Sequence, residues 1–183
     1  MRLLTFKKNN SYRNNYKVLA DWCLKDPIDV DNYSLKKYES KIYNSYHWND
    51  YEKLKTDRKK IRFYVKKIFK ELIKNLNKNH NFKFPEYYWA TIILPWLYEL
   101  ISNLFDKWEI ISLIKNKKKI EILLKKFKER NFYYEKSDEF DIHTEDFNNY
   151  ILSKIVNFKY KSKFKNVKYL NSLSNKKKNK SSN

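Results

Sequence analysis

The sequence predicts a helix-rich α/β fold in which short N-terminal strands are followed by long, packed helices. Three observations support this prediction: a short apolar run near the N-terminus, a long amphipathic stretch after it, and an apolar, aromatic stretch that begins at Pro85. With 183 residues and 42% hydrophobic side chains, the chain has the size and apolar content of one domain. We expect a single globular domain over residues 1–160 and a basic, mostly disordered tail over residues 161–183.

Two short strands are expected near the N-terminus. Residues 16–24 contain a short apolar run with charged residues on either side of it and Asp26-Pro27 after it. This pattern is typical of a buried strand. Residues 3–6 are its expected partner. Residues 26–49 are rich in Asp, Asn, Ser and Tyr without a clear period, so they predict a long loop.

Two long helices are expected to follow. The first lies between residues 50 and 77, where apolar residues recur at spacings of three, four and seven and lysines occupy most other positions. The second opens at Pro85, a residue suited to a first turn, and we expect a kink at Pro95 because proline lacks an amide hydrogen. Charged residues from Glu99 onward interrupt its apolar run before the ~20 residues that a membrane span needs.

The C-terminal third is less clearly patterned. Residues 117–130 place several apolar residues on one helical face, but residues 119–125 could equally form a strand, and both interpretations remain open. The spacing of Phe147, Tyr150, Ile151 and Ile155 predicts a further helix.

The formal net charge of +20 suggests a polyanionic partner, but the residue types weaken that suggestion. Only five of the 41 basic residues are Arg, the residue that makes bidentate contacts to phosphate and guanine. Gly is absent, and Lys, Asn and Ile are abundant, as A/T-rich coding produces. Under such a bias exposed positions drift to Lys and Asn, so we do not expect nucleic acid to be the main partner.

Composition also excludes several site chemistries. A chain without Gly contains neither a Walker loop nor a Rossmann fingerprint, since both need backbone positions without a side chain. A single cysteine, Cys23, allows no internal disulfide, and the three His residues have no metal-site spacing. No cofactor and no metal are evident. Because the first residues form no signal-peptide apolar segment, we expect the protein to remain in the cytoplasm.

Three polar residues are candidates for catalysis: Asp21, His47 and His80. Asp21 follows the first predicted strand, and side chains at the carboxyl ends of strands often project into a cleft. His47 has no structural role that the sequence explains. His80 closes the first long helix, where a histidine can simply complement the helix dipole.

Aromatic and acidic residues supply the candidates for ligand binding. Aromatic rings can stack on sugars or bases, although at helical spacing they more often belong to a core. Asp50 directly precedes the first long helix, so N-capping is the competing interpretation there. The candidates are Trp22, Trp48, Asp50, Tyr88, Trp89, Trp96, Asp106 and Trp108.

The order of these motifs resembles the N-terminal region of the LIC12162 family of transferases, which occur in bacterial surface-polysaccharide and O-antigen loci. The matching pieces are residues 19–24, 47–50, 76–80, Tyr88-Trp89, Pro95-Trp96-Leu97 and 105–108. Several collinear Trp motifs are more specific than any one alone. The resemblance implies a group transferase of surface-carbohydrate synthesis, with a nucleotide sugar or carbohydrate as substrate.

The chain departs from the family pattern at some positions. Asp21 stands where the family usually has Glu, and Ala90 and Lys107 stand where it has Arg. Family members are also much longer, which implies that this chain is an N-terminal module, truncated or split from a separately encoded donor-binding half. We expect Asp21, His47, His80 and the Trp residues to face one cleft.

Two alternatives remain open. The first is a non-catalytic, Lys-rich protein that binds nucleic acid or an anionic membrane surface. The second is a remnant that keeps a fold without activity.

Overall fold

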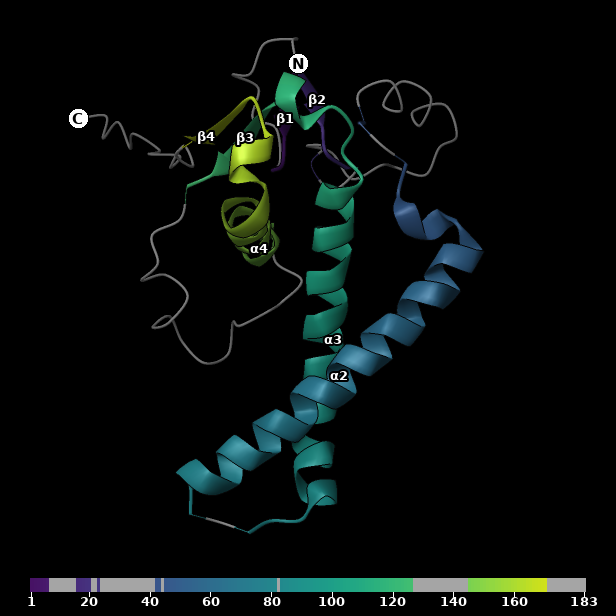
Figure 1. The fold of residues 1–183 in the computed structure, drawn as a ribbon, viewed down its shortest axis with the longest axis vertical. Coiled ribbons are helices and arrows are strands. Elements are labelled where there is room, and N and C mark those ends of the chain that lie inside the picture. The colour runs from purple at the N-terminus through teal and green to yellow at the C-terminus, as the bar shows by residue number, and fades with distance from the viewer. Residues whose placement is uncertain are drawn as a thin grey trace, which may run out of the picture.

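The computed structural model of the chain describes residues 1–6, 16–20, 23, 42–43, 45–81, 83–126 and 145–170. These residues form a parallel sheet, two long helices and a shorter third helix (Figure 1). The strands and helices are β1 (Arg2–Leu4), β2 (Tyr16–Val18), α2 (Tyr51–Asn79), α3 (Glu86–Ser112), β3 (Glu121–Lys125), α4 (Glu145–Ile155) and β4 (Asn166–Leu170). Short helical turns lie at His47–Asn49, Lys117–Lys119, Val156–Tyr160 and Lys161–Lys163.

The sheet has the strand order β2-β1-β3-β4, and every pairing in it is parallel. Leu3 of β1 lies opposite Lys17 of β2 on one side and Ile122 of β3 on the other. The two inner strands carry unbroken apolar runs instead of alternating ones, because parallel strands are covered on both faces.

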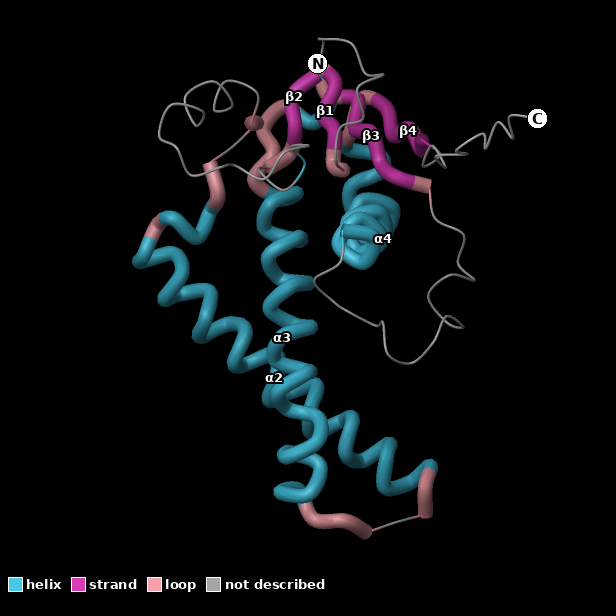
Figure 2. The backbone as a smooth tube through the Cα atoms, turned by 180° about the vertical axis from the view of Figure 1, so that it is seen from behind, coloured by secondary structure: helices cyan, strands magenta, loops and turns pink. Residues whose placement is uncertain are grey.

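One hydrophobic core joins the sheet to the C-terminal half of α3 and to α4. Both helices lie against the sheet end of the molecule in the two opposite views (Figures 1 and 2). Fully buried members include Leu4, Leu124, Ile111 and Leu152.

The helices α2 and α3 form an antiparallel hairpin whose turn lies far from the sheet (Figure 2). This hairpin has a small core of its own, made by Ile61, Val65, Phe69, Leu97 and Ile101. The side chain of Asn77 fixes the turn, because it bonds both the amide and the carbonyl of Phe84 and accepts from the indole of Trp89 at 2.9 Å. α3 continues unbroken through Pro95.

The helix-rich α/β prediction is confirmed; one alternative that the sequence leaves open is decided, and one expected boundary differs. Residues 121–125 form strand β3, because β1 and β4 pair with it from both sides, and a helix there would leave β4 without a partner and β1 paired only with β2. The expected tail does not begin at residue 161: residues 161–163 form a helical turn and 166–170 form β4. Residues 171–183 lie outside the described part of the chain. Among the described helices, none is long and apolar enough to cross a bilayer.

Candidate functional site: a buried histidine and aspartate

A histidine and an aspartate from different elements meet in the interior near the sheet. His47 belongs to the short turn that precedes α2, and Asp106 lies on α3. The Nε2 atom of His47 is 2.9 Å from Oδ1 of Asp106, and the two side chains are only 1% and 7% exposed. The other carboxylate oxygen, Oδ2, accepts from the ammonium of the adjacent Lys107 at 2.6 Å.

The charge state of Asp106 fixes the direction of this hydrogen bond. Burial alone would raise the pKa of Asp106, but the hydrogen bond from His47 and the positive charge of Lys107 outweigh it, and the pKa lies below its ordinary value. Asp106 is therefore a carboxylate at neutral pH and can only accept, so Nε2 of His47 donates. In the neutral imidazole, Nδ1 then carries a lone pair.

The Nδ1 atom of His47 is buried and has no hydrogen-bond partner among the described residues. Buried polar atoms are rarely left in this condition, because the unmade hydrogen bond costs about 1–3 kcal/mol. An imidazole held by a carboxylate through one nitrogen, with the other nitrogen open as an acceptor, has the arrangement of a general base.

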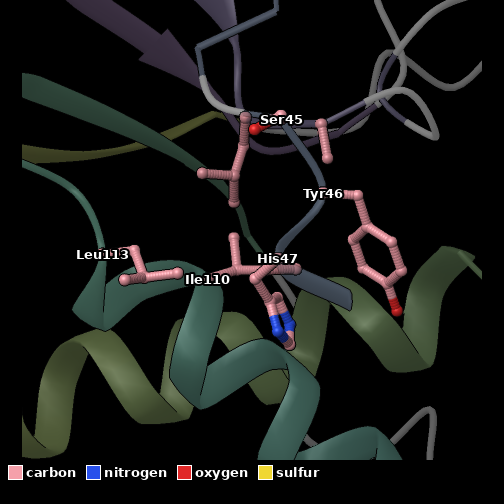
Figure 3. Close-up of a pocket in the computed structure, with 7 residues that line it drawn as sticks. Ser45, Tyr46, His47, Ile110 and Leu113 are labelled. Carbon is pink, nitrogen blue, oxygen red and sulfur yellow. The ribbon is translucent and has the colours of Figure 1, made fainter. Parts of the chain in front are cut away.

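A small pocket adjoins this histidine (Figure 3). Its volume is about 250 Å³, part of which is open to solvent, and its enclosed part has room for about one water-sized group. It is lined by Leu19, Ala20, Ser45, Tyr46, His47, Ile110 and Leu113. Leu19 and Ala20 directly follow β2, so the pocket lies at the carboxyl end of a parallel strand, where ligands of α/β sheets commonly bind.

A second polar network fixes the start of α2 against α3. The buried carboxylate of Asp57 accepts from the indole of Trp48 at 3.3 Å and from the ammonium groups of Lys53 at 2.8 Å and Lys60 at 3.1 Å. Lys53 also donates to Glu109 of α3 at 2.8 Å. Burial would raise the pKa of Asp57, yet the hydrogen bonds from the lysines and Trp48 lower it below its ordinary value. This network holds the turn that carries His47.

Among the described candidates, His47 lines the pocket, and Asp106 contacts the far side of its ring through Nε2 without lining the pocket itself. Trp48 follows His47, but its indole is engaged by Asp57 and its ring packs on the hairpin core. Asp50 is the N-cap of α2, since its side chain accepts from the amide of Lys53 at 3.0 Å. These two residues therefore support the site from outside the pocket.

The expectation of one cleft shared by His47, His80 and the Trp residues is wrong. His47 precedes α2 and His80 caps its other end, so the 29 residues of the helix, at ~1.5 Å each, separate them by roughly 44 Å. Trp89 bonds Asn77 at that distant end, Tyr88 stacks on Phe84 beside it, and Trp96 lies on the exposed side of the hairpin.

Trp108 packs against other side chains at the sheet end of α3. Its ring meets that of Tyr160 edge-on, with centroids 5.9 Å apart, and the ammonium of Lys159 lies 4.5 Å from its centroid. Trp108 is not among the residues that line the pocket.

The candidates Asp21 and Trp22 lie outside the described residues. Their flanking neighbours in the sequence, Ala20 and Cys23, are both buried, and Ala20 lines the pocket.

Sequence reasoning missed Asp57 and Lys107 as well as the pocket residues Ser45 and Tyr46. Asp57 had a recognisable signal: it stands three residues after Leu54 and four before Ile61, on the apolar face of its own helix. A charged residue at such a position needs a partner. Ser45 and Tyr46 follow a stretch without periodicity and gave no comparable signal.

The model of the LIC12162 family transferase matches residues 3–183 of the chain. Searches among curated proteins and among solved structures gave no match. The family match spans both the sheet and the hairpin, so it includes the elements that bring His47 and Asp106 together. The chain therefore belongs to the LIC12162 family of transferases.

Proposed function

We propose that this chain transfers a group to a hydroxyl acceptor in the synthesis of O-antigen-type surface carbohydrate, with His47 as the general base. Family membership supports the transferase class. The observation that carries the assignment of a base is the open Nδ1 of His47, on an imidazole whose Nε2 is held by an ionised Asp106.

In the proposed step, the acceptor hydroxyl donates its hydrogen bond to Nδ1 of His47. As the acceptor oxygen forms its bond to the electrophilic atom of the donor, the bond to the leaving group breaks and the leaving group takes the electron pair. The hydroxyl proton passes to Nδ1, and the carboxylate of Asp106 stabilises the imidazolium that results. The enclosed part of the pocket has the size of one such hydroxyl.

The pocket must widen before a whole sugar can reach His47, because Nδ1 is shielded from solvent and the enclosed space is small. Tyr46 and Ser45 form one wall of the pocket, and Tyr46 offers a ring on which a sugar face can stack. We propose Asp21 and Trp22 as further ligand contacts, because they follow Ala20 of the lining in the sequence.

Donor binding is proposed to involve a separately encoded transferase half. A sequence without Gly has no phosphate loop of the glycine-rich kind, and a nucleotide sugar is far larger than the described pocket. Co-expression of this chain with the product of a neighbouring transferase gene tests the idea. A stable complex after purification supports it, and two independently eluting proteins count against it.

The assignment of His47 is tested by restoring surface carbohydrate in a host from which the gene has been deleted. We expect His47→Gln and Asp106→Asn to restore far less than the natural chain, with initial rates at least ~10²-fold lower, because general base catalysis contributes about that much. His80→Gln is the matched histidine control at the far end of α2. If His47→Gln restores the polymer as fast as His80→Gln does, the base assignment fails.

A further inference from the structure

While Phe63, Tyr87 and Tyr98 are exposed elsewhere on the surface of the α2–α3 hairpin, several of its other exposed large apolar side chains lie on one side of it. On α2 these are Tyr64 and Ile68, which are 45% and 39% exposed. On α3 they are Tyr88, Ile92 and Trp96, which are 39%, 56% and 43% exposed. The three α3 residues are spaced by four, so they form one stripe along that helix. We refer to these five residues as the aromatic face.

Helix geometry places both stripes on the same side of the hairpin. Each member of the aromatic face directly precedes a residue that packs between the helices: Val65 and Phe69 on α2, and Trp89, Ile93 and Leu97 on α3. In two antiparallel right-handed helices, the residue one position before an inward-facing residue lies on the same side of the pair in both. The aromatic face is therefore a single surface.

Positive charge borders this surface. α2 carries eleven Lys and Arg residues against three Asp and Glu residues, and most of the basic residues are exposed. Lys67 and Lys74, seven residues apart, lie next to the aromatic face on the outer side of α2. Two exposed acidic residues also lie beside it: Glu71 of α2, and Glu99 of α3, which stands three residues after Trp96. An apolar, Trp- and Tyr-containing surface with lysines along its edge is the pattern of a helix that lies in a membrane interface.

We propose that the aromatic face docks on the surface of a bilayer that contains anionic lipid. Trp96, Ile92 and Ile68 enter the boundary between head groups and acyl chains, while Lys67 and Lys74 extend their ammonium groups to lipid phosphates. The hairpin is placed for this contact because its turn lies far from the sheet (Figure 1).

Charge and apolarity together select a membrane over other partners. A nucleic-acid surface would engage the lysines but would leave Ile68 and Ile92 in water, and α2 offers only two Arg residues for bidentate phosphate contacts. A second copy of the chain would bring one basic helix close to another basic helix, which charge repulsion opposes. An anionic bilayer satisfies both the lysines and the apolar side chains.

Flotation of the full chain with lipid vesicles tests the proposal. Vesicles of phosphatidylglycerol mixed with phosphatidylcholine are expected to carry the chain to the top of the gradient, and vesicles of phosphatidylcholine alone are expected to carry at least tenfold less. The double variant Ile92→Ser with Trp96→Ser and the double variant Lys67→Gln with Lys74→Gln should each bind at least fivefold more weakly. Brominated lipid should quench part of the Trp emission of the natural chain, and Trp96→Phe should remove that part.

Two matched controls test whether vesicle binding depends on the aromatic face or on any exposed charge or apolar side chain of the protein. Phe158→Ser removes a side chain that is 86% exposed but lies in the turn after α4, and Lys118→Gln with Lys119→Gln removes two exposed charges after α3. Both controls should bind vesicles as the natural chain does, and circular dichroism should show the same unfolding temperature for all variants.

Three results would overturn the proposal. One is vesicle binding that the Ile92 and Trp96 substitutions leave unchanged. The second is a dimer in sedimentation that those substitutions dissociate, without vesicle binding, which would assign the face to a second copy. The third is binding of duplex DNA that is tighter than vesicle binding and independent of Trp96.

Discussion

The imidazole of His47 and the carboxylate of Asp106 lie 2.9 Å apart, measured from Nε2 to Oδ1, although 59 residues separate them in the chain. The hairpin of α2 and α3 makes this contact possible, because its antiparallel path returns the end of α3 to the start of α2. The pair is therefore a product of tertiary structure and has no local sequence motif.

Nitrogen NMR should show His47 with its proton on Nε2 when the ring is neutral, because an ionised Asp106 can only accept. Asp106→Asn should move protons toward Nδ1, since an amide NH₂ can donate to Nε2 and so favour the other tautomer. Asp50→Asn changes an acid at the N-cap of α2 and should leave the tautomer unaltered. A proton found on Nδ1 in the natural chain would contradict the hydrogen-bond direction described above.

Removing the buried carboxylate of Asp57 should destabilise the fold. We expect Asp57→Ala to lower the free energy of unfolding by about 1.5–3 kcal/mol, as for loss of charge-assisted hydrogen bonds, because Trp48, Lys53 and Lys60 all lose their shared acceptor. Urea denaturation measures the change. A loss no larger than that of an ordinary surface substitution would contradict the network.

The pH dependence of that effect has a definite sign. The pKa of Asp57 is lowered from 3.8 in the folded chain, so its contribution to stability is present above that value and is lost as the pH falls through the folded pKa. The difference in unfolding free energy between the natural chain and Asp57→Ala should stay constant from neutral pH to about pH 5 and shrink below about pH 4. A difference that instead grows in acid would contradict the direction of the shift.

Substitutions of Asp50 test whether its carboxylate acts as the N-cap of α2 or as a ligand contact. Its side chain accepts from the amide of Lys53, so Asp50→Ala should cost about 1 kcal/mol of stability, while Asp50→Ser should keep most of it because serine also caps helices. Thermal unfolding monitored by circular dichroism gives both values. Equal losses for Ala and Ser would show that the carboxylate acts in some other way.

The exposed ion pairs around Glu121 on the sheet should contribute far less to the free energy of unfolding than the buried network of Asp57. Glu121 accepts from Arg2 and Lys168, which lie on neighbouring strands, and the Lys168 hydrogen bond is the largest of the causes that lower the pKa of Glu121. Because Arg2 and Lys168 are 60% and 50% exposed, Glu121→Gln should cost less than about 1 kcal/mol, and the cost should fall further in high salt. A cost as large as that of Asp57→Ala would be unexpected.

The long helices were predictable because their signals are local. The spacings of three, four and seven between Ile61, Val65, Ile68 and Leu72 predict α2, and Pro85 directly precedes α3. In the structure Phe69 takes the buried position and Ile68 is 39% exposed. The sequence does not decide between helix and strand at β3, because Ile122, Leu123 and Leu124 form a short apolar run that suits either one. Only its pairing with β1 and β4, which lie far away in the sequence, decides between them.

The site was predictable in part. Residue type identifies both His47 and Asp106 as candidates. It does not show that His47 and His80 lie at opposite ends of one 29-residue helix, because that depends on where α2 begins and ends. The described Trp residues are spread from the turn before α2 to the sheet end of α3. Trp48, Trp89 and Trp108 each pack against different neighbours, and Trp96 is 43% exposed. Order along the chain therefore did not translate into proximity.

The placement of β1 in the middle of the sheet dictates when this chain can fold during synthesis. β1 precedes β3, one of its two neighbours in the sheet, by more than a hundred residues, and β4 completes the described sheet only at Leu170. The α2–α3 hairpin needs no distant partner and can form while translation continues. The sheet can therefore close only after β3 and β4 have been synthesised, so Leu3 and Leu4 of β1 lack part of their native apolar cover while the hairpin already forms.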